Sequence, residues 1–398
     1  MKEYKISELG RIARGKSKHR PRNDKILYGG EYPFIQTGDV KKANLYIDKH
    51  SNTYNEVGLK QSKLWDKGTL CITIAANIAD TAILKYPACF PDSIIGFQAY
   101  EDRSDVRYIK YYFDIFKKHM ESISMGATQN NLSVAKLESI TFKVHELEEQ
   151  TKIANVLSTY DKLIENNNRR IQILEQTAEE LYKEWFVRMR FPGYEKTKFH
   201  KGIPEGWEVR RIKDLGEVIT GKTPSTNDEE NYGGEVMFVK TPDMNGNLFT
   251  IETESYLSNK GNDSQPKKLI PEGSIMVSCI GTGGVVSING YPAHTNQQIN
   301  SIILNKSLER EWAYFTLHSM KGTIELFGAT GVTMTNLSKG KFENLKILYP
   351  INDLVLRYHT LTKGIFSKIK NLNIQNQNLK KQRDLLLPRL MNGTITVK

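Results

Sequence analysis

The chain has 398 residues, of which 25% are charged and 39% hydrophobic, a balance that is typical of folded domains and excludes intrinsic disorder. The length predicts two to three domains, and the absence of a bilayer-spanning apolar run predicts a cytoplasmic protein without membrane contact. Cys71, Cys89 and Cys279 are too few and too scattered for a disulfide framework or a zinc cluster. The net charge of +11 favours a polyanionic partner.

Residues 1–145 are predicted to form a mixed module. β-type runs at 32–36, 69–74 and 94–100 are separated by Gly, Asn and Asp turns, and a helix-like stretch follows at 106–120. Much of the positive charge is concentrated near the start of this module, between Arg11 and Lys25.

Residues 207–350 repeat this order after a Pro/Gly linker at 191–206. Their β-type runs lie at 237–240, 274–280 and 299–304, and a helix-like stretch lies at 311–326.

The two modules also share short sequence motifs. Tyr-Gly-Gly-Glu at 28–31 recurs at 232–235, and Thr-x-Asp at 37–39 recurs at 241–243. The separation stays at about 205 residues along the whole half-chain, which is too long for a solenoid repeat. The sequence therefore predicts two homologous modules, an arrangement suited to reading two separated sites on one ligand.

Each module is followed by a heptad-patterned segment, at 146–190 and 351–398. Apolar residues recur there at alternating spacings of four and three, which predicts coiled-coil helices. A helix of about 38 residues would be roughly 57 Å long. Two independent surface helices are the alternative, but the equal lengths and matched phase favour pairing with each other.

An asparagine interrupts each apolar seam, and this pair predicts the register. If a pseudo-two-fold axis relates the modules, the helices run antiparallel and Asn167 faces Asn376, because a lone buried amide would cost about 1–3 kcal/mol. The same register gives three further facing pairs: Trp185 with Tyr358, Ile153 with Leu390, and Tyr160 with Arg383, whose guanidinium is expected over the tyrosine ring.

Two motifs suggest other chemistry, and neither has the right context. The phosphate-loop pattern G-x-x-x-x-G-K-[ST] occurs at 10–17 and 216–223, but a basic or polar loop follows it instead of an apolar helix. The glycine-rich stretch 279–284 lacks the third glycine of a dinucleotide fingerprint, so we interpret it as a tight loop. The sequence contains no recognisable catalytic constellation and no metal-ligand spacing.

Basic and polar loops are the candidate DNA-binding sites of both modules. We expect Lys16, Lys18, Arg20 and Arg22 to contact phosphate on one half-site, and Lys222 and Lys240 on the other. The amides and hydroxyls of Gln129, Asn130, Asn131, Asn296, Gln297, Thr333 and Thr335 can recognise base edges. For any one of these clusters, an ordinary surface loop with capping residues is the alternative.

These features together resemble the specificity subunit of type I restriction–modification systems, over essentially the whole chain. The most specific stretches are Leu-Glu-Glu-Gln at 147–150, Leu-Tyr-Lys-Glu-Trp-Phe-Val at 181–187, Pro-Glu-Gly-Trp at 204–207, Gly-Lys-Thr-Pro at 221–224 and Leu-Leu-Pro-Arg-Leu-Met-Asn-Gly at 386–393. The second helix departs from the family pattern, because Ile-Asn-Asp-Leu follows Pro350 where a Glu-Gln pair is usual.

The resemblance implies an α+β fold in which two mixed α/β target-recognition domains are joined by two long antiparallel coiled-coil helices. It also implies a non-enzymatic subunit that binds no cofactor and reads a bipartite, asymmetric site on double-stranded DNA. Two modification (methyltransferase) subunits and the restriction (translocase/nuclease) subunits would be its partners. S-adenosylmethionine, ATP and magnesium would bind to those partners.

Two readings from other classes remain open. A DNA-modifying enzyme with a cryptic active site would methylate or cleave DNA as the purified chain alone. A coiled-coil scaffold that binds only proteins would lack a DNA affinity that falls steeply with salt.

Overall fold

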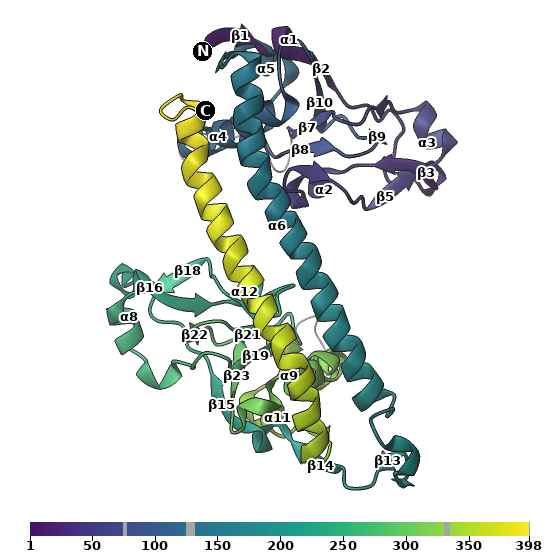
Figure 1. Cartoon of the computed structure of the whole chain (residues 1–398), viewed down its shortest axis with the longest axis vertical. Coiled ribbons are helices and arrows are strands. Elements are labelled where there is room, and N and C mark those ends of the chain that lie inside the picture. The colour runs from purple at the N-terminus through teal and green to yellow at the C-terminus, as the bar shows by residue number, and fades with distance from the viewer. Residues whose placement is uncertain (75–77, 125–131, 330–334, 398) are drawn as a thin grey trace. The chain divides into compact units, whose positions relative to one another are not determined.

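The computed structural model describes residues 1–74, 78–124, 132–329 and 335–397. The chain divides into two compact units, Met1–Glu165 with Gln377–Lys398, and Asn166–Asn376. Each unit contains one of the predicted modules and a part of both long helices (Figure 1). No helix among the described residues is long and apolar enough to cross a membrane.

Unit 1 begins with short strands and ends with long helical segments. In chain order its elements are β1 (Lys2–Lys5), α1 (Ile6–Leu9), β2 (Gly10–Arg14), η1 (Lys25–Leu27), β3 (Tyr28–Phe34), α2 (Thr37–Lys42), β4 (Tyr46–Ile47), β5 (Asn52–Tyr54), α3 (Glu56–Lys60), β6 (Leu64–Trp65), β7 (Leu70–Thr73), β8 (Thr81–Leu84), β9 (Ala88–Cys89), β10 (Ile94–Ala99), α4 (Val106–Ser124), α5 (Val134–Ser139), β11 (Thr141–Val144) and the first part of α6 (Leu147–Tyr182).

Unit 2 starts within α6 and ends within the last helix. Its further elements are the π-helical turn η2 (Lys183–Val187), η3 (Tyr194–Lys196), β12 (Phe199–His200), β13 (Ile203–Pro204), β14 (Glu208–Arg211), η4 (Ile212–Asp214), β15 (Gly216–Thr220), η5 (Glu229–Asn231), β16 (Tyr232–Val239), α7 (Thr241–Met244), β17 (Phe249–Thr250), β18 (Ser255–Leu257), α8 (Asn259–Asp263), η6 (Pro266–Lys268), β19 (Ile275–Ser278), β20 (Ile280–Gly281), β21 (Val286–Asn289), β22 (Ala293–Thr295), β23 (Ile299–Leu304), η7 (Ser307–Glu309), α9 (Arg310–Ser319), α10 (Lys321–Gly328), β24 (Thr335–Asn336), α11 (Lys339–Glu343), β25 (Lys346–Tyr349) and α12 (Asn352–Met391). The last residues of α12 belong to unit 1.

The two modules have the same sheet topology, which confirms the predicted duplication. The five-stranded sheet has the order β2-β10-β7-β8-β4 in unit 1 and β15-β23-β19-β21-β17 in unit 2. Each strand of one sheet has its counterpart at the same position in the other. In unit 1 a single core joins this sheet, through Ile72 and Phe97, to Phe113 of α4 and to Ile153 and Leu390 of the long helices.

The repeated Tyr-Gly-Gly-Glu motif forms the same β-bulge in both modules. The register of β3 against β5 shifts between Tyr28 and Tyr32, and that of β16 against β18 shifts between Tyr232 and Val236. The first glycine of each motif has a left-handed backbone, with φ of 85° at Gly29 and 84° at Gly233.

The repeated Thr-x-Asp motif caps a short helix in both modules. Asp39 accepts a hydrogen bond from the backbone N–H of Gln36 at 2.9 Å, at the start of α2. Asp243 accepts the equivalent bond from Lys240 at 2.7 Å, at the start of α7. Both motifs thus fix the local backbone conformation.

The helix predicted at 311–326 is instead two helices, α9 and α10, that meet at Met320. The hydroxyl of Ser319 donates to the carbonyl of Thr316 at 2.8 Å, which competes with helix continuation, and Gly322 follows the break. The predicted single helix of the first module, by contrast, is present as α4.

The long helices run antiparallel in the register that the asparagines predicted. Within unit 2, Asn167 donates to the side-chain oxygen of Asn376 at 3.0 Å, and both side chains are buried. Further along the same pair, the rings of Trp185 and Tyr358 lie 6.1 Å apart, and the Tyr358 hydroxyl donates to the carbonyl of Ala178 at 2.9 Å. In unit 1, Ile153 and Leu390 belong to one hydrophobic core.

The predicted contact of Arg383 with the Tyr160 ring is replaced by another. The guanidinium of Arg383 pairs with the carboxylate of Asp161, the residue next to Tyr160, and also donates to Asn44 at 3.2 Å. A buried carboxylate is a stronger partner for a guanidinium than a ring face is, because the carboxylate also needs its charge compensated.

The buried amide pair gives a stability prediction. We expect Asn167→Leu to lower the free energy of unfolding by about 1–3 kcal/mol, because the buried Asn376 oxygen loses its donor. The double variant Asn167→Leu with Asn376→Leu should recover much of this loss, because both amides are then replaced. Denaturant unfolding measures both, with Asn166→Leu on the exposed face of α6 as the control. Losses that simply add in the double variant would contradict a coupled pair.

Candidate nucleic-acid interface

The first candidate surface is the basic loop, residues 15–24, between β2 and η1. Its backbone is held by neighbouring segments: the N–H of Lys16 donates to the carbonyl of Phe90 at 3.1 Å, and the N–H of Lys18 donates to the Gln61 side chain at 2.7 Å. The Tyr28 hydroxyl donates to the carbonyl of Arg22 at 2.8 Å. The loop backbone is thus fixed by hydrogen bonds.

The matching loop of the second module, residues 221–228, is held in the same way. The N–H of Lys222 donates to the carbonyl of Thr295 at 2.9 Å, and the Gln265 side chain donates to the carbonyl of Lys222 at 3.0 Å. The Tyr232 hydroxyl donates to the carbonyl of Pro224 at 2.9 Å. Because equivalent Tyr and Gln side chains hold both loops, the loops are equivalent parts of the two modules.

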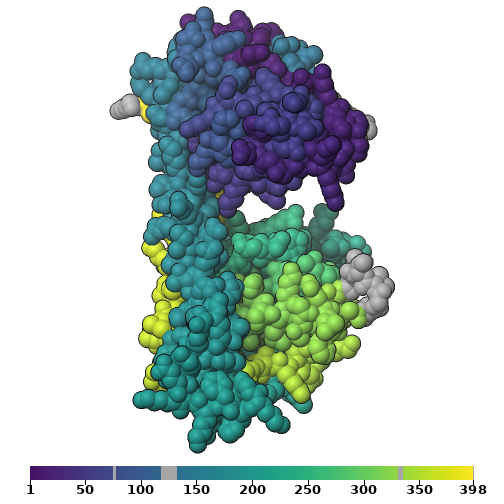
Figure 2. Space-filling model, turned by 90° about the vertical axis from the view of Figure 1, so that its right-hand side faces the viewer, coloured from purple at the N-terminus to yellow at the C-terminus, as the bar shows by residue number. Residues whose placement is uncertain are grey.

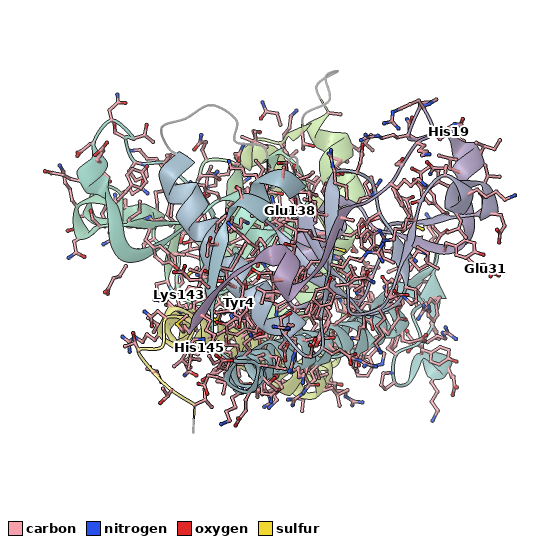
Figure 3. All side chains as sticks on the ribbon, turned by 90° about the horizontal axis from the view of Figure 1, so that it is seen from above. Tyr4, His19, Glu31, Glu138, Lys143 and His145 are labelled. Carbon is pink, nitrogen blue, oxygen red and sulfur yellow. The ribbon has the colours of Figure 1, made fainter. Side chains whose placement is uncertain are left out.

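The lysines of these loops present free charge at the surface. Lys16, Lys18 and Lys222 are exposed. Figure 2 shows residues of the first module, in purple and blue, at the surface of unit 1. His19, within the basic loop, lies at the periphery of unit 1, well apart from Lys143 of β11 (Figure 3). Exposed lysines on a fixed loop suit contact with DNA phosphates.

The two arginines of the basic loop differ from its lysines, because each has partners within the protein. Arg20 donates to the carbonyls of Ser17 and His19, both at 2.8 Å. Arg22 forms an ion pair with Asp92 at 2.8 Å, on the turn between β9 and β10. Asp92 offsets the charge of Arg22 and fixes the direction of its guanidinium.

Lys240 has the least freedom of the predicted phosphate contacts. Its side chain is half-buried, and the ammonium donates to the Ser255 hydroxyl at 2.8 Å. Glu254 lies 3.9 Å from the same ammonium. Lys240 therefore adds less free positive charge to this surface than Lys222 does.

The second module carries a polar platform, which we define as Thr223, Thr241, Asn296, Gln297 and Gln298. These residues follow the ends of β15, β16 and β22, so three strands bring them together. Thr223 donates to Gln297 at 2.6 Å, Asn296 to Gln298 at 3.2 Å, and Thr241 to Gln298 at 3.4 Å. Such amide and hydroxyl groups match the donor and acceptor pattern of base edges.

The remaining predicted base contacts fall in other places. Thr335 was expected in an accessible loop, and this prediction is wrong. The residue lies in β24, and only 8% of it is exposed. Gln129, Asn130, Asn131 and Thr333 lie outside the described residues.

Sequence reasoning missed the residues that position these loops. Asp92 holds Arg22, and Gln61 accepts from the backbone N–H groups of both Lys18 and His19. The sequence duplication could have indicated both residues, because Asp92 aligns with Gln297, and Gln61 aligns with Gln265, at the repeat spacing.

The two Gly-Lys motifs do not have the local fold of a phosphate loop. A loop, not a helix, follows Lys16 and Lys222, so there is no helix N-terminus to receive phosphates. A Cβ on Gly15 would lie 2.2 Å from the Pro91 carbonyl oxygen, so this glycine serves close backbone packing. The stretch 279–284 connects the antiparallel strands β19 and β21 and contains the short strand β20, so a strand follows it and not a helix.

Comparison with known proteins identifies the family. Residues 1–176 and 204–384 match the family described as the type I restriction modification DNA specificity domain. The chain is 32% identical over 343 residues to the HindI type I restriction enzyme specificity subunit of Haemophilus influenzae, covering 71% of this chain and 74% of that protein. It is 28% identical over 410 residues to the MjaIX specificity subunit of Methanocaldococcus jannaschii, covering 99% and 93%.

The fold is similar to that of a solved structure. The crystal structure of the S subunit of a type I restriction-modification system from M. genitalium superposes with a TM-score of 0.60 at 14% identity, covering 98% of this chain and 96% of that one. The chain belongs to the family of type I restriction-modification specificity subunits. It is a DNA-recognising, non-catalytic subunit that works with partner subunits.

The loop geometry predicts how salt affects binding. Lys16→Ala, Lys18→Ala and Lys222→Ala should each weaken binding to all DNA sequences alike. Each should also lower the magnitude of the slope of log K against log salt by about one, because a complex with one phosphate contact fewer releases fewer counterions when it forms. Titration of duplex DNA at several salt concentrations measures this. Lys143→Ala, an exposed lysine far from the basic loop, is the control. An unchanged slope in all three variants would remove these loops from the interface.

Proposed function

We propose that this chain reads a bipartite, asymmetric sequence on double-stranded DNA, one block with each module. The observation that carries the proposal is that the two modules have the same scaffold and different surfaces. Their five-stranded sheets share one strand order, whereas Asp92 of the first module stands where the second has Gln297. Two modules with the same fold and different surface side chains are suited to reading two different blocks of DNA sequence.

The partners that we propose are the other subunits of a type I restriction–modification complex. Two modification subunits would use S-adenosylmethionine to methylate the DNA, and restriction subunits would use ATP and magnesium to translocate and cleave it. This chain would bring them to the site in the cytoplasm without binding those cofactors itself. Its three thiols are buried, which raises the pKa of Cys279 to about 11 and also raises those of Cys71 and Cys89. Thiols in this state are poor nucleophiles.

Within the first module we assign Lys16 and Lys18 to phosphate and Arg22 to a base edge. Asp92 pairs with Arg22 at 2.8 Å, so its guanidinium is less available as a free charge and more fixed in direction. A directed guanidinium suits the bidentate contact with guanine O6 and N7.

The Arg22 assignment predicts a loss of discrimination. Arg22→Ala should raise the Kd for the recognised sequence by roughly 5- to 150-fold, since a bidentate contact contributes about 1–3 kcal/mol of discrimination. The Kd for a scrambled duplex should rise less, because there the variant leaves Asp92 uncompensated but loses no base contact. Lys18→Ala is the matched control, and it should raise both values alike. An equal loss on both duplexes for Arg22→Ala would place Arg22 on phosphate instead.

Independent reading predicts the result of a module exchange. Replacement of residues 207–350 by the same segment of another family member should change one block of the methylated sequence and leave the other unchanged. Sequencing of methylated bases in cells that express the chimera with the partner subunits measures this, with the unaltered chain as the control. A change in both blocks would contradict independent reading.

A further inference from the structure

The two modules are attached to the long helices at equivalent junctions. α4 starts at Val106 and α9 at Arg310, so Lys110 and Tyr111 correspond to Tyr314 and Phe315. At the repeat spacing of the long helices, Asp161 of α6 corresponds to Phe366 of α12, and Arg383 of α12 corresponds to Ala178 of α6. The fold of the junction is shared, and its side chains can therefore be compared position by position.

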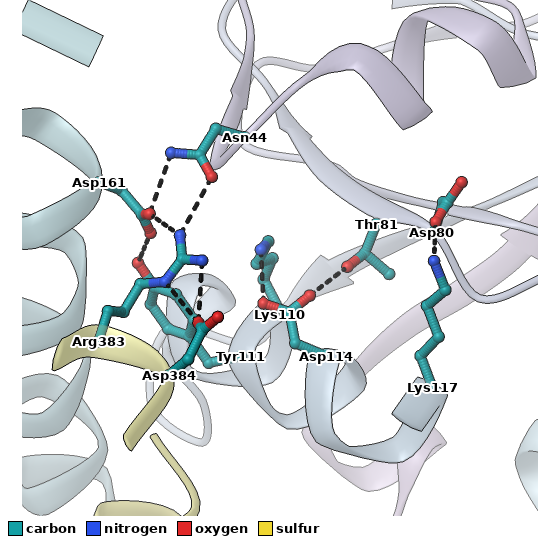
Figure 4. Close-up of polar contacts among 10 residues, drawn as sticks. All are labelled: Asn44, Asp80, Thr81, Lys110, Tyr111, Asp114, Lys117, Asp161, Arg383 and Asp384. Atoms are coloured by element: carbon teal, nitrogen blue, oxygen red, sulfur yellow. Dashed lines mark hydrogen bonds and ion pairs between the residues drawn. The ribbon is translucent and has the colours of Figure 1, made fainter. Parts of the chain in front are cut away.

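The junction of unit 1 is polar and charged (Figure 4). Asp161 has only 1% of its side chain exposed, and its carboxylate accepts from the Tyr111 hydroxyl and from the Arg383 guanidinium. Asn44 donates to the same carboxylate at 3.0 Å. Burial and the Asp161 charge raise the pKa of Tyr111, which keeps its hydroxyl a donor. One buried carboxylate thus ties α4, α6 and α12 together.

Further charged residues of the first module line a cavity beside Arg383. Lys110, with 6% of its side chain exposed, pairs with Asp114 at 2.6 Å, and the Thr81 hydroxyl lies 3.5 Å from that carboxylate. Lys117 pairs with Asp80. A cavity of about 290 Å³ opens among these groups, lined by residues of α4 and α12. Each of these lysines is therefore compensated by a carboxylate of the first module itself.

The equivalent junction of unit 2 is aromatic. The ring of Phe366 lies 6.0 Å from Tyr314, 5.9 Å from Phe315 and 6.1 Å from Phe249. The ring of Phe315 also lies 5.6 Å from Tyr182. Ala178, which stands where Arg383 is in unit 1, is fully buried in the same core.

We propose that the two junctions form a positional key, by which each half of the helix pair accepts only the module that carries matching junction residues. A first module placed on the aromatic junction would bury the Tyr111 hydroxyl against Phe366 with no Asp161 to accept its hydrogen bond, and would place the Lys110–Asp114 ion pair among aromatic rings. A second module placed on the charged junction would leave Asp161 and Arg383 facing Tyr314 and Phe315. The two modules are therefore not interchangeable between positions, although their folds are equivalent.

The positional key concerns assembly and does not depend on which bases the modules read. It adds a condition to module exchange, since the donor segment must come from the same position or carry the same junction chemistry. The helix residues Asp161 and Arg383, with Ala178 and Phe366, are the ones that set this condition.

A duplicated chain tests the key. In the first version, a copy of residues 207–350 replaces residues 1–145 and the helices are unchanged; in the second, Asp161→Phe and Arg383→Ala are added. We expect the two substitutions to raise the unfolding midpoint of the duplicated chain by at least about 3 °C, and to lower that of the natural chain by a similar amount. The same sign of effect in both backgrounds would overturn the proposal.

A second measurement decides the matter if neither duplicated chain folds. In the natural chain, Asp161→Phe should lower the unfolding midpoint less when Lys110→Tyr and Tyr111→Phe are already present, because the junction is then aromatic on both sides. Val209→Ala, on the exposed edge of β14 in unit 2, is the control and should show no such coupling with Asp161→Phe. Losses that add without coupling would overturn the key.

Discussion

A buried pair of amides fixes the register of the two long helices, and the arrangement of each unit depends on that register. Asn167 and Asn376 would each be a liability in an apolar seam, and they are tolerated because they bond each other at 3.0 Å. A slip by one heptad would separate them and would also part Trp185 from Tyr358. The helices could pair in several ways on apolar contacts alone, and the amides select one.

The helix pair also carries the asymmetry of the chain. Its two halves present equivalent positions to the two modules, yet one half offers Asp161 and Arg383 and the other offers Phe366 and Ala178. The loops show the same principle at the surface, since equivalent Tyr and Gln side chains hold loops of different charge. The two modules thus share one fold, while the residues at the helix junctions and in the surface loops differ.

Much of the fold could be predicted because its signals are local or repeated. The Tyr-Gly-Gly-Glu and Thr-x-Asp motifs recur since a bulge and a helix cap demand them. The heptads and their asparagines contained the antiparallel register. Family membership followed from motifs spread over the whole chain, and the comparisons confirm it.

The remaining features depend on contacts between distant residues. Arg383 was expected over Tyr160, but its partner is the neighbouring Asp161, which also bonds Tyr111 and Asn44. Heptad spacing identifies the facing turn of a helix, and it does not reveal which side chain of that turn a third element also binds. The burial of Thr335 in β24 has the same origin, because that strand pairs with β20, about 55 residues earlier in the chain.

The most direct test of this account is the sequence that the natural chain selects. Methylated bases should be mapped in DNA from cells that express this chain with its modification subunits and no other methyltransferase. The account predicts one motif with two different defined blocks, separated by a spacer of fixed length and unspecified sequence. A single continuous block, or two identical blocks, would contradict reading by two modules with different surfaces.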